Sequence, residues 1–290
     1  MLSKRLVTGP VLVAVLLLVV WLDEQTGGLT LSGAALPPGL PLLIICLVAS
    51  VFAGLELSRV AAASGRRAAP VLTIVGSGSL LVAMWTGGAA GEAGWAVLVT
   101  LGLWFASMVV HAQGKRTEGV LADAAVTTGT ALYVGIGLGF YLLLREDLSA
   151  WWIAAIVLIT KSCDIGAYFT GCSIGRHKLI PWLSPGKTVE GLIGGCITAI
   201  LVSVAASHVL ADAGFAAIGW PLAAVLGLVL AVAGQGGDLT MSLLKRGCGA
   251  KDSASTLPGM GGVMDVLDSI LLAGPVAWLV LTLAGVPATP

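Results

Sequence analysis

The sequence predicts an all-α, polytopic integral membrane protein with about nine transmembrane helices, and two observations carry this prediction. The 290 residues are 57% hydrophobic and only 10% charged, whereas a soluble domain has about 25% charged residues. Nine stretches of the chain are apolar over about 20 residues, the length that an α-helix needs to cross a bilayer. The formal net charge of +0 gives no reason to expect a nucleic-acid partner.

The predicted spans follow one another along the chain, with boundaries that are loose by several residues. The first span lies behind Lys4 and Arg5, as in a signal peptide, but no A-x-A-like cleavage site follows it, so we expect a retained helix. The fifth and sixth spans are the least regular because each contains polar positions. The nine spans cover residues 6–22, 40–58, 69–86, 93–112, 120–144, 149–170, 189–211, 214–236 and 263–286.

Lysine and arginine alternate between successive loops, and this alternation predicts the orientation. They precede the first span and follow the second, fourth, sixth and eighth spans, whereas the loops after the first, third and seventh spans and the C-terminal tail contain none. The loop after the fifth span has Arg145 beside Glu146 and Asp147. Because basic residues in short loops mark the cytoplasmic side, we expect a multi-pass protein of the cell membrane. Its N-terminus and active-site loops would lie in the cytoplasm and its C-terminus outside.

The cysteines are scattered and mostly lie in apolar runs. Without a C-x-x-C pair or a His/Cys cluster, they indicate neither a disulfide framework nor a zinc site. They are Cys46, Cys163, Cys172, Cys196 and Cys248.

Glycine, proline and acidic residues join the basic residues in two segments that we expect to face the cytoplasm, 161–191 and 234–268. Both segments belong to residues 149–290, which we predict to be the catalytic transmembrane region, whereas residues 1–148 would contribute about five N-terminal helices.

In the first segment, Lys161 and Asp164 are three residues apart and share a helix face. Such a pair is costly at membrane depth unless it faces a bundle interior or a water-filled cavity. It is either a structural ion pair or part of a site.

The stretch SPGKT in the first segment surrounds a Pro-Gly turn just before the seventh span. It supplies Ser184, Lys187 and Thr188 next to the free N–H groups of a helix start, an arrangement that suits a phosphate. The spacing is not that of a P-loop, and Thr188 could simply be the N-cap of the helix.

The second segment brings acids together with basic residues and glycines. Asp238 ends the predicted eighth span behind glycines that allow close backbone approach, and Asp265 and Asp268 lie one turn apart at the start of the ninth span. Mg²⁺ is typically bound by one or two carboxylates together with phosphates and water, so we predict that these three acids hold Mg²⁺. The alternative is that the acids compensate the helix dipole. The residues that would bind phosphate oxygens are Lys245, Arg246 and Lys251.

These motifs resemble those of the phosphatidate cytidylyltransferases, also called CDP-diacylglycerol synthases. The family signature runs S-x-x-K-R, K-D, P-G-H-G-G and D-R-x-D, and the likeness extends from about Asp164 to Pro275. The sequence departs from it at Met260, Val266 and Val189, where the family has histidine, arginine and often an aromatic residue. The matching positions are Asp164 to Tyr168, Ser184 to Gly191, Gly237, Asp238, Ser242, Lys245, Arg246, Lys251, Asp252, Pro258, Gly259, Gly261, Gly262, Asp265 and Asp268.

The resemblance implies that CTP and phosphatidate react to give CDP-diacylglycerol and pyrophosphate. It also implies Mg²⁺, with a second cation beside it, and a homodimer embedded in membrane lipid. We assign catalytic roles to Lys187, Lys245, Arg246, Lys251 and Asp252, substrate binding to Asp164, Ser184, Thr188, Glu190, Ser242, Gly261 and Gly262, and the metal to Asp238, Asp265 and Asp268.

Two other functions fit parts of the sequence. An ion-coupled transporter would also use intramembrane acids, here Glu56, Asp164 and Asp265, with glycine-broken helices. Such a protein would more often contain inverted repeats, and the first half has no second copy of the 234–268 pattern. A related lipid kinase acting on a polyprenol or phytol would share the architecture, and only its choice of nucleotide separates it from a cytidylyltransferase.

Overall fold

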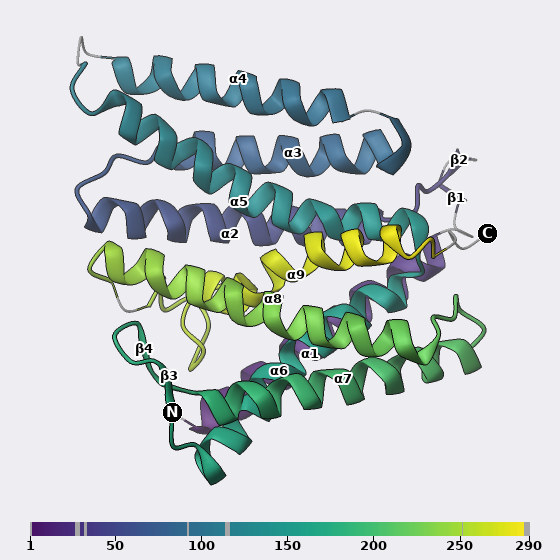
Figure 1. The fold of residues 1–290 in the computed structure, drawn as a ribbon. Coiled ribbons are helices and arrows are strands. Elements are labelled where there is room, and N and C mark those ends of the chain that lie inside the picture. Colours follow the sequence, from purple (N-terminus) through teal and green to yellow (C-terminus); the bar gives the residue numbers. More distant parts are fainter. Residues whose placement is uncertain are drawn as a thin grey trace. The chain divides into compact units, whose positions relative to one another are not determined.

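The computed structural model describes residues 2–26, 30–31, 34–91, 93–113, 117–250 and 252–286. Within these residues, nine helices are long and apolar enough to cross a membrane. The strands in the same ranges form two short antiparallel pairs, β1–β2 and β3–β4. The predicted all-α, polytopic fold class is therefore confirmed (Figure 1).

The chain divides into two compact units, residues 1–143 with 244–267 and residues 144–243 with 268–290. The helices α5, α8 and α9 each contribute to both units. The predicted boundary after residue 148 separates the catalytic region from the N-terminal helices by function, whereas the two units are defined by compactness. The functional boundary stays a prediction.

The first unit is built around α2, which packs against α1 and α3, while α3 packs in turn against α4 (Figure 1). Polar side chains fix the ends of these helices. The buried Asp23 accepts a hydrogen bond from the backbone N–H of Leu42, and Asp123 accepts one from that of Arg67. The elements are α1 (Leu2–Thr26), β1 (Thr30–Leu31), β2 (Ala34–Ala35), α2 (Leu40–Ala63), α3 (Pro70–Gly91), α4 (Ala93–Ala112) and most of α5 (Val120–Asp147).

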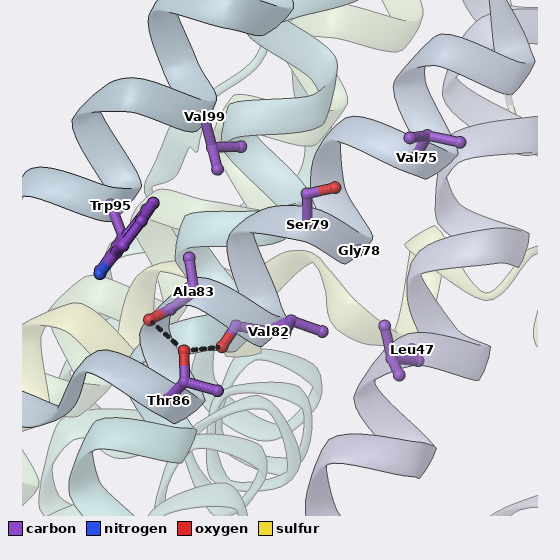
Figure 2. A pocket seen from close by; sticks show the side chains of 9 residues that line it. All are labelled: Leu47, Val75, Gly78, Ser79, Val82, Ala83, Thr86, Trp95 and Val99. Atoms are coloured by element: carbon purple, nitrogen blue, oxygen red, sulfur yellow. Dashed lines mark hydrogen bonds between the residues drawn. The ribbon is translucent and has the colours of Figure 1, made fainter.

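A cavity of about 530 Å³ opens between α2, α3 and α4. Its lining is mostly apolar, and Figure 2 shows Leu47, Val75 and Trp95 around it. The Thr86 hydroxyl donates back to the carbonyl of Val82 in its own helix, at 2.9 Å. None of the nine residues that line this cavity is titratable.

The second unit depends on close contact between α6 and α7 (Figure 1). Glycine makes this contact possible: a Cβ at Gly166 would collide with Thr198, and a Cβ at Gly194 would collide with Thr170. Small residues at such positions let transmembrane helices approach closely. The elements are α6 (Ala150–Ile174), β3 (Lys178–Ile180), β4 (Ser184–Thr188), α7 (Val189–Asp212), α8 (Trp220–Gly247) as far as residue 243, and α9 (Met264–Leu283) from residue 268.

Buried hydroxyls also join α7 to the segment that follows it. Ser203 donates to the carbonyl of Ala223 at 2.6 Å, and Ser207 donates to that of Ile218 at 2.7 Å. Because no water is available in a bilayer core, polar groups there need partners within the protein. These serines therefore stabilise helix packing rather than a site.

The eighth helix differs most from its predicted position. The predicted span was 214–236, whereas α8 begins at Trp220 and ends at Gly247. Hydropathy detects only the apolar part of a helix, and the backbone hydrogen bonds continue through the polar residues that follow. Ser242 and Lys245 therefore lie on a helix rather than in the loop after it, and Asp238 lies within that helix rather than at its end.

Candidate functional site

The second unit contains a connected network of polar side chains, which we call the lysine–acid cluster. Its members come from α6, β4, α8 and α9 and are joined by hydrogen bonds, ion pairs or charge interactions. They are Lys161, Asp164, Lys187, Gln235, Asp238, Asp268 and Ser269.

The β3–β4 hairpin brings Lys187 to α8. The strands pair Lys178 with Thr188, and Lys187 Nζ lies 2.5 Å from Asp238 Oδ2. The lysine side chain is 19% exposed and the aspartate side chain 30%. The structure thus joins two predicted site residues that are 51 positions apart, in a pair that solvent can still reach.

Gln235 connects this pair to α6. Its Oε1 accepts a hydrogen bond from Lys187 Nζ, and its Nε2 donates one to Asp164 Oδ1, both at 2.8 Å. We did not predict this residue. The sequence feature that could have identified Gln235 is its position in an apolar span, one helical turn before Asp238. A polar group there requires a partner.

Lys161 occupies the other side of the cluster. Its Nζ donates to Ser269 Oγ at 2.6 Å and lies 3.9 Å from both Asp164 Oδ2 and Asp268 Oδ1. The predicted pairing of Lys161 with Asp164 is confirmed, and the lysine lies between two acids. Ser269 is a further residue that the sequence argument missed.

Close packing of α8 on α9 brings Asp238 to Asp268. A Cβ at Gly237 would collide with the backbone carbonyl oxygen of Asp268, and the two carboxylates are close enough to interact directly. Adjacent carboxylates repel each other unless a proton or a cation compensates them, and the cluster has one more acid than it has lysines. The donor set suits Mg²⁺, which prefers oxygen ligands and is commonly held by one or two carboxylates.

The third acid predicted for the metal, Asp265, has protein donors on both oxygens. Its Oδ1 accepts from Lys245 Nζ at 2.6 Å, and its Oδ2 accepts from Gly262 N at 2.8 Å and from Ser253 Oγ at 2.9 Å. Among the residues that the structure describes, no group of three or more His, Cys, Asp or Glu side chains is placed to hold a metal ion. Binding of a metal by Asp265 stays a prediction.

Asp265 belongs to a second network, in the first unit, which we call the loop cluster. It joins α2, the end of α8, the loop 252–263 and the start of α9. Its members are Glu56, Lys245, Ser253, Thr256, Gly262, Val263, Met264 and Asp265.

The glycine turn of this loop has the backbone conformation that glycine permits. Gly259 and Gly261 have φ angles of 83° and 93°, values that other residues rarely adopt. A Cβ at Gly262 would collide with the carboxylate of Glu56 and the hydroxyl of Ser253. The space that Gly262 leaves is therefore filled by groups of the protein itself, and substrate binding by Gly261 and Gly262 stays a prediction.

The remaining residues predicted in the first polar segment lie on or beside the hairpin. Ser184 is half-buried on β4. Thr188 is the N-cap of α7 and accepts a hydrogen bond from Gly191 N at 3.1 Å, which is the alternative that the sequence left open. Glu190 accepts hydrogen bonds from the backbone N–H groups of Arg176 and His177 and thereby closes the base of the hairpin.

The other predicted residues of the second polar segment are spread along α8 and the loop after it. Ser242 is half-buried and Arg246 is exposed, both on α8, and Asp252 is exposed in the loop. Lys251 lies outside the described residues. Among the described residues, the structure therefore adds no contact from Ser242, Arg246 or Asp252 to the two clusters.

Comparison with known proteins gives consistent matches. The family model described as "Cytidylyltransferase family" matches residues 3–284. A phosphatidate cytidylyltransferase of Chlamydia pneumoniae is 35% identical over 198 residues, 64% of this chain and 62% of the relative. One of Staphylococcus haemolyticus is 38% identical over 159 residues, 55% of this chain and 59% of the relative. The uncharacterized protein YnbB of Escherichia coli (strain K12) is 40% identical over 121 residues, 42% of this chain and 39% of the relative. Each match spans less than two thirds of the relative's length.

Proposed function

Because the chain belongs to the cytidylyltransferase family, we propose that it is a phosphatidate cytidylyltransferase, a membrane enzyme of phospholipid biosynthesis. The substrates would be CTP and phosphatidate, and the products CDP-diacylglycerol and pyrophosphate. The observation that carries this proposal is the family match over residues 3–284, which includes both polar clusters. The names of relatives such as the phosphatidate cytidylyltransferases of Chlamydia pneumoniae and Staphylococcus haemolyticus suggest the substrate.

The reaction is a nucleotidyl transfer. A phosphate oxygen of phosphatidate attacks the α-phosphorus of CTP, the bond from that phosphorus to the β-phosphate oxygen breaks, and pyrophosphate leaves. Positioning the reactants and neutralising their charge supply most of the rate enhancement in such a transfer. The protein therefore needs fixed cations more than it needs a nucleophile.

We propose Lys187 as a phosphate ligand in the second unit. It is bound to Asp238 and Gln235 but remains partly exposed. When a triphosphate binds, its oxygens can replace Asp238 as partners of the ammonium group, because a lysine side chain is flexible and has three donors. The other proposed phosphate ligands and catalytic residues are Lys245, Arg246, Lys251 and Asp252.

We propose Asp238 and Asp268 as the pair that would hold Mg²⁺, with Asp265 as the third predicted ligand and a second cation implied by the family resemblance. Bound there, the ion would withdraw charge from phosphate oxygens. The paired carboxylates and the excess of acids over lysines in the lysine–acid cluster support this assignment. The residues proposed to contact substrate are Asp164, Ser184, Thr188, Glu190, Ser242, Gly261 and Gly262.

Dimerisation and orientation belong to the same proposal. We expect a homodimer in the cell membrane, with the N-terminus and the SPGKT hairpin in the cytoplasm and residue 290 outside. The alternation of basic residues supports this orientation. A reporter fused after Gly186 should score cytoplasmic, and one fused after Pro290 should score external.

The activity is tested with the purified full chain in lipid nanodiscs. CTP labelled at the α-phosphate should transfer its label to lipid, and pyrophosphate should appear in equal amount, only when phosphatidate is present. Diacylglycerol, which lacks the attacking phosphate, is the matched control substrate. Label transferred to lipid from γ-labelled nucleotide instead would identify a kinase and contradict the proposal, as would pyrophosphate release that does not depend on phosphatidate.

A further inference from the structure

Glu56 is a buried acid near the end of the predicted span 40–58, and none of the proposed catalytic steps uses it. It lies on α2, and its residue is 1% exposed. Four donors surround its carboxylate, and all of them come from the loop 252–263 or the first residue of α9. They are Ser253 Oγ at 3.0 Å, Val263 N at 2.9 Å, Met264 N at 2.9 Å and Thr256 Oγ1.

The donors are divided evenly between the two carboxylate oxygens. Oε1 accepts from Thr256 and Val263, and Oε2 accepts from Met264 and shares the single Ser253 hydroxyl hydrogen with Asp265 Oδ2. A carboxylate group offers about four acceptor sites, so these partners occupy most of the hydrogen-bonding capacity of Glu56. A buried acid with such a set of partners belongs to a fixed structure rather than to an open path for ions.

Two of these donors are backbone groups at the start of a helix. α9 begins at Met264, and the first N–H groups of a helix have no partner within it. They also form the positive end of the helix dipole, where a carboxylate is stabilising. Glu56 thus acts as the cap of α9 although it lies on α2.

Ser253 connects Glu56 to Asp265 because it contacts both carboxylates. Its hydroxyl oxygen lies 3.0 Å from Glu56 Oε2 and 2.9 Å from Asp265 Oδ2, and its backbone N–H donates to the same Asp265 oxygen at 3.2 Å. Asp265 in turn accepts from Lys245 Nζ at 2.6 Å. Glu56 therefore sits at the start of a chain of contacts that ends at a proposed phosphate-binding lysine.

We propose that Glu56 is a positioning residue for the transferase reaction: it anchors the loop 252–263 and the start of α9, and through Ser253 it fixes Asp265 and Lys245. The catalytic part of this inference rests on the proposed function. The anchoring part rests only on contacts within the first unit, and the two parts can be measured separately.

The anchoring is tested by hydrogen–deuterium exchange on the full chain in nanodiscs. Glu56→Gln keeps the size of the side chain but replaces one acceptor oxygen with an NH₂ group, which cannot accept from a backbone N–H. We expect the amides of Val263 and Met264 to exchange at least about tenfold faster than in the wild type. Glu56→Asp, which keeps both oxygens on a shorter side chain, should show an intermediate rate. Unchanged exchange at both amides would overturn the proposal, whatever the activity.

The matched control is Asp123→Asn. Asp123 is also a buried acid of the first unit that accepts from a loop backbone N–H, that of Arg67 at 3.2 Å, but it contacts neither cluster. This variant should accelerate exchange around Arg67 and leave the amides of 263 and 264 protected. General acceleration in both variants would mean that any buried acid stabilises the whole unit, and it would overturn a specific role for Glu56.

The kinetic consequence is measured on the same preparations. Changing a residue that orients the groups in contact with substrate or metal typically lowers activity by about 10–100-fold, and we expect Glu56→Gln to lower kcat by that factor with the KM for CTP changed less. Ser253→Ala should lower kcat too, and the double variant should be little worse than either single one, since both act along one chain of contacts. Normal kcat per folded molecule in Glu56→Gln would reduce the residue to a stabilising role and overturn the positioning. An inactive wild type would instead refute the proposed function, and the exchange data would still decide the anchoring.

Discussion

The two clusters use similar residues in different ways. In the loop cluster, Glu56 receives hydroxyl and backbone donors whose positions the chain fixes. In the lysine–acid cluster, Lys161 and Lys187 have long, flexible side chains and make the contacts to the acids. Backbone donors cannot leave their partner without unfolding a turn, whereas a lysine can exchange one anion for another. The first arrangement is suited to holding geometry, and the second is suited to binding and releasing a charged ligand.

Glycine serves both clusters in the same manner. Gly262 leaves space for the carboxylate of Glu56, and Gly237 lets α8 approach the backbone at Asp268. In each case the missing side chain brings an acid to a place where a methyl group would exclude it. Glycines near an acidic motif thus indicate where acids are packed, in addition to where a ligand could fit.

The largest effect should follow from removing a carboxylate of the lysine–acid cluster. Asp238→Asn or Asp268→Asn keeps the shape but removes a charge, and we expect turnover to fall by at least about 10²–10³. If the acids only compensated a helix dipole, the loss would be about 0.3–1 kcal/mol of stability with near-normal turnover. CDP-lipid formation across a Mg²⁺ titration measures the difference. Asp212→Asn, at the exposed end of α7, is the control. Turnover within about threefold of the wild type at limiting Mg²⁺ would refute the metal assignment.

The next effect concerns the proposed exchange of partners by Lys187. Lys187→Gln should lower kcat/KM for CTP by about 10² because one charged donor to phosphate is lost. Lys178→Gln, on the other strand of the same hairpin and exposed, is the matched control and should stay close to the wild type. Equal losses in both variants would show that only the general charge of the hairpin matters, and the distinction between a holding and an exchanging cluster would lose its main support.

Asp265→Asn tests whether Asp265 acts only within the loop cluster or also binds the metal. We expect turnover to fall by about 10–100-fold because Lys245 and the loop lose their common partner. The Mg²⁺ concentration that gives half-maximal turnover then distinguishes two roles. A rise would support Asp265 as the third ligand predicted from the sequence, and an unchanged value would assign it to the loop cluster alone. Near-normal turnover would contradict both roles.

The smallest effect on catalysis should come from Gln235→Leu, which acts mainly on stability. It would leave Asp164 and Lys187 without the amide that joins them, and a buried polar group without its partner costs about 1–3 kcal/mol. Thermal unfolding in detergent measures this loss. Gln113→Leu, at an exposed position after α4, should leave the melting temperature nearly unchanged. A melting temperature for Gln235→Leu equal to that of the wild type would show that the hydrogen bonds of Gln235 do not stabilise the folded protein.

Hydropathy predicted the fold well because crossing a membrane demands a long apolar helix. It could not predict where α8 ends, since the stretch from Gly237 to Gly247 is too polar to count as a span and yet is helical. The hairpin was missed for a similar reason: SPGKT reads as a turn, and its pairing with Lys178 depends on residues outside the motif.

The candidate site was predictable only where local spacing decides a contact. The pairing of Lys161 with Asp164 follows from a separation of three residues on one helix. The partners of Glu56 lie 197 to 208 positions away, and no local pattern specifies contacts at that distance. Glu56 was instead considered as a transporter acid, because an isolated acid in an apolar span does not reveal whether it faces water or a set of donors.

The long separation between Glu56 and its donors has a consequence for biosynthesis. The second helix leaves the ribosome and enters the bilayer while the donors at Ser253 to Met264 are still untranslated, 197 to 208 codons downstream. An acidic side chain in an inserting helix is costly unless it finds a partner or water. The other residues of α2, which contains an 18-residue window with a mean hydropathy of 2.4, help to offset that cost before the donors exist. The contacts that hold Glu56 in the folded protein can therefore form only after the last part of the polypeptide has been synthesised.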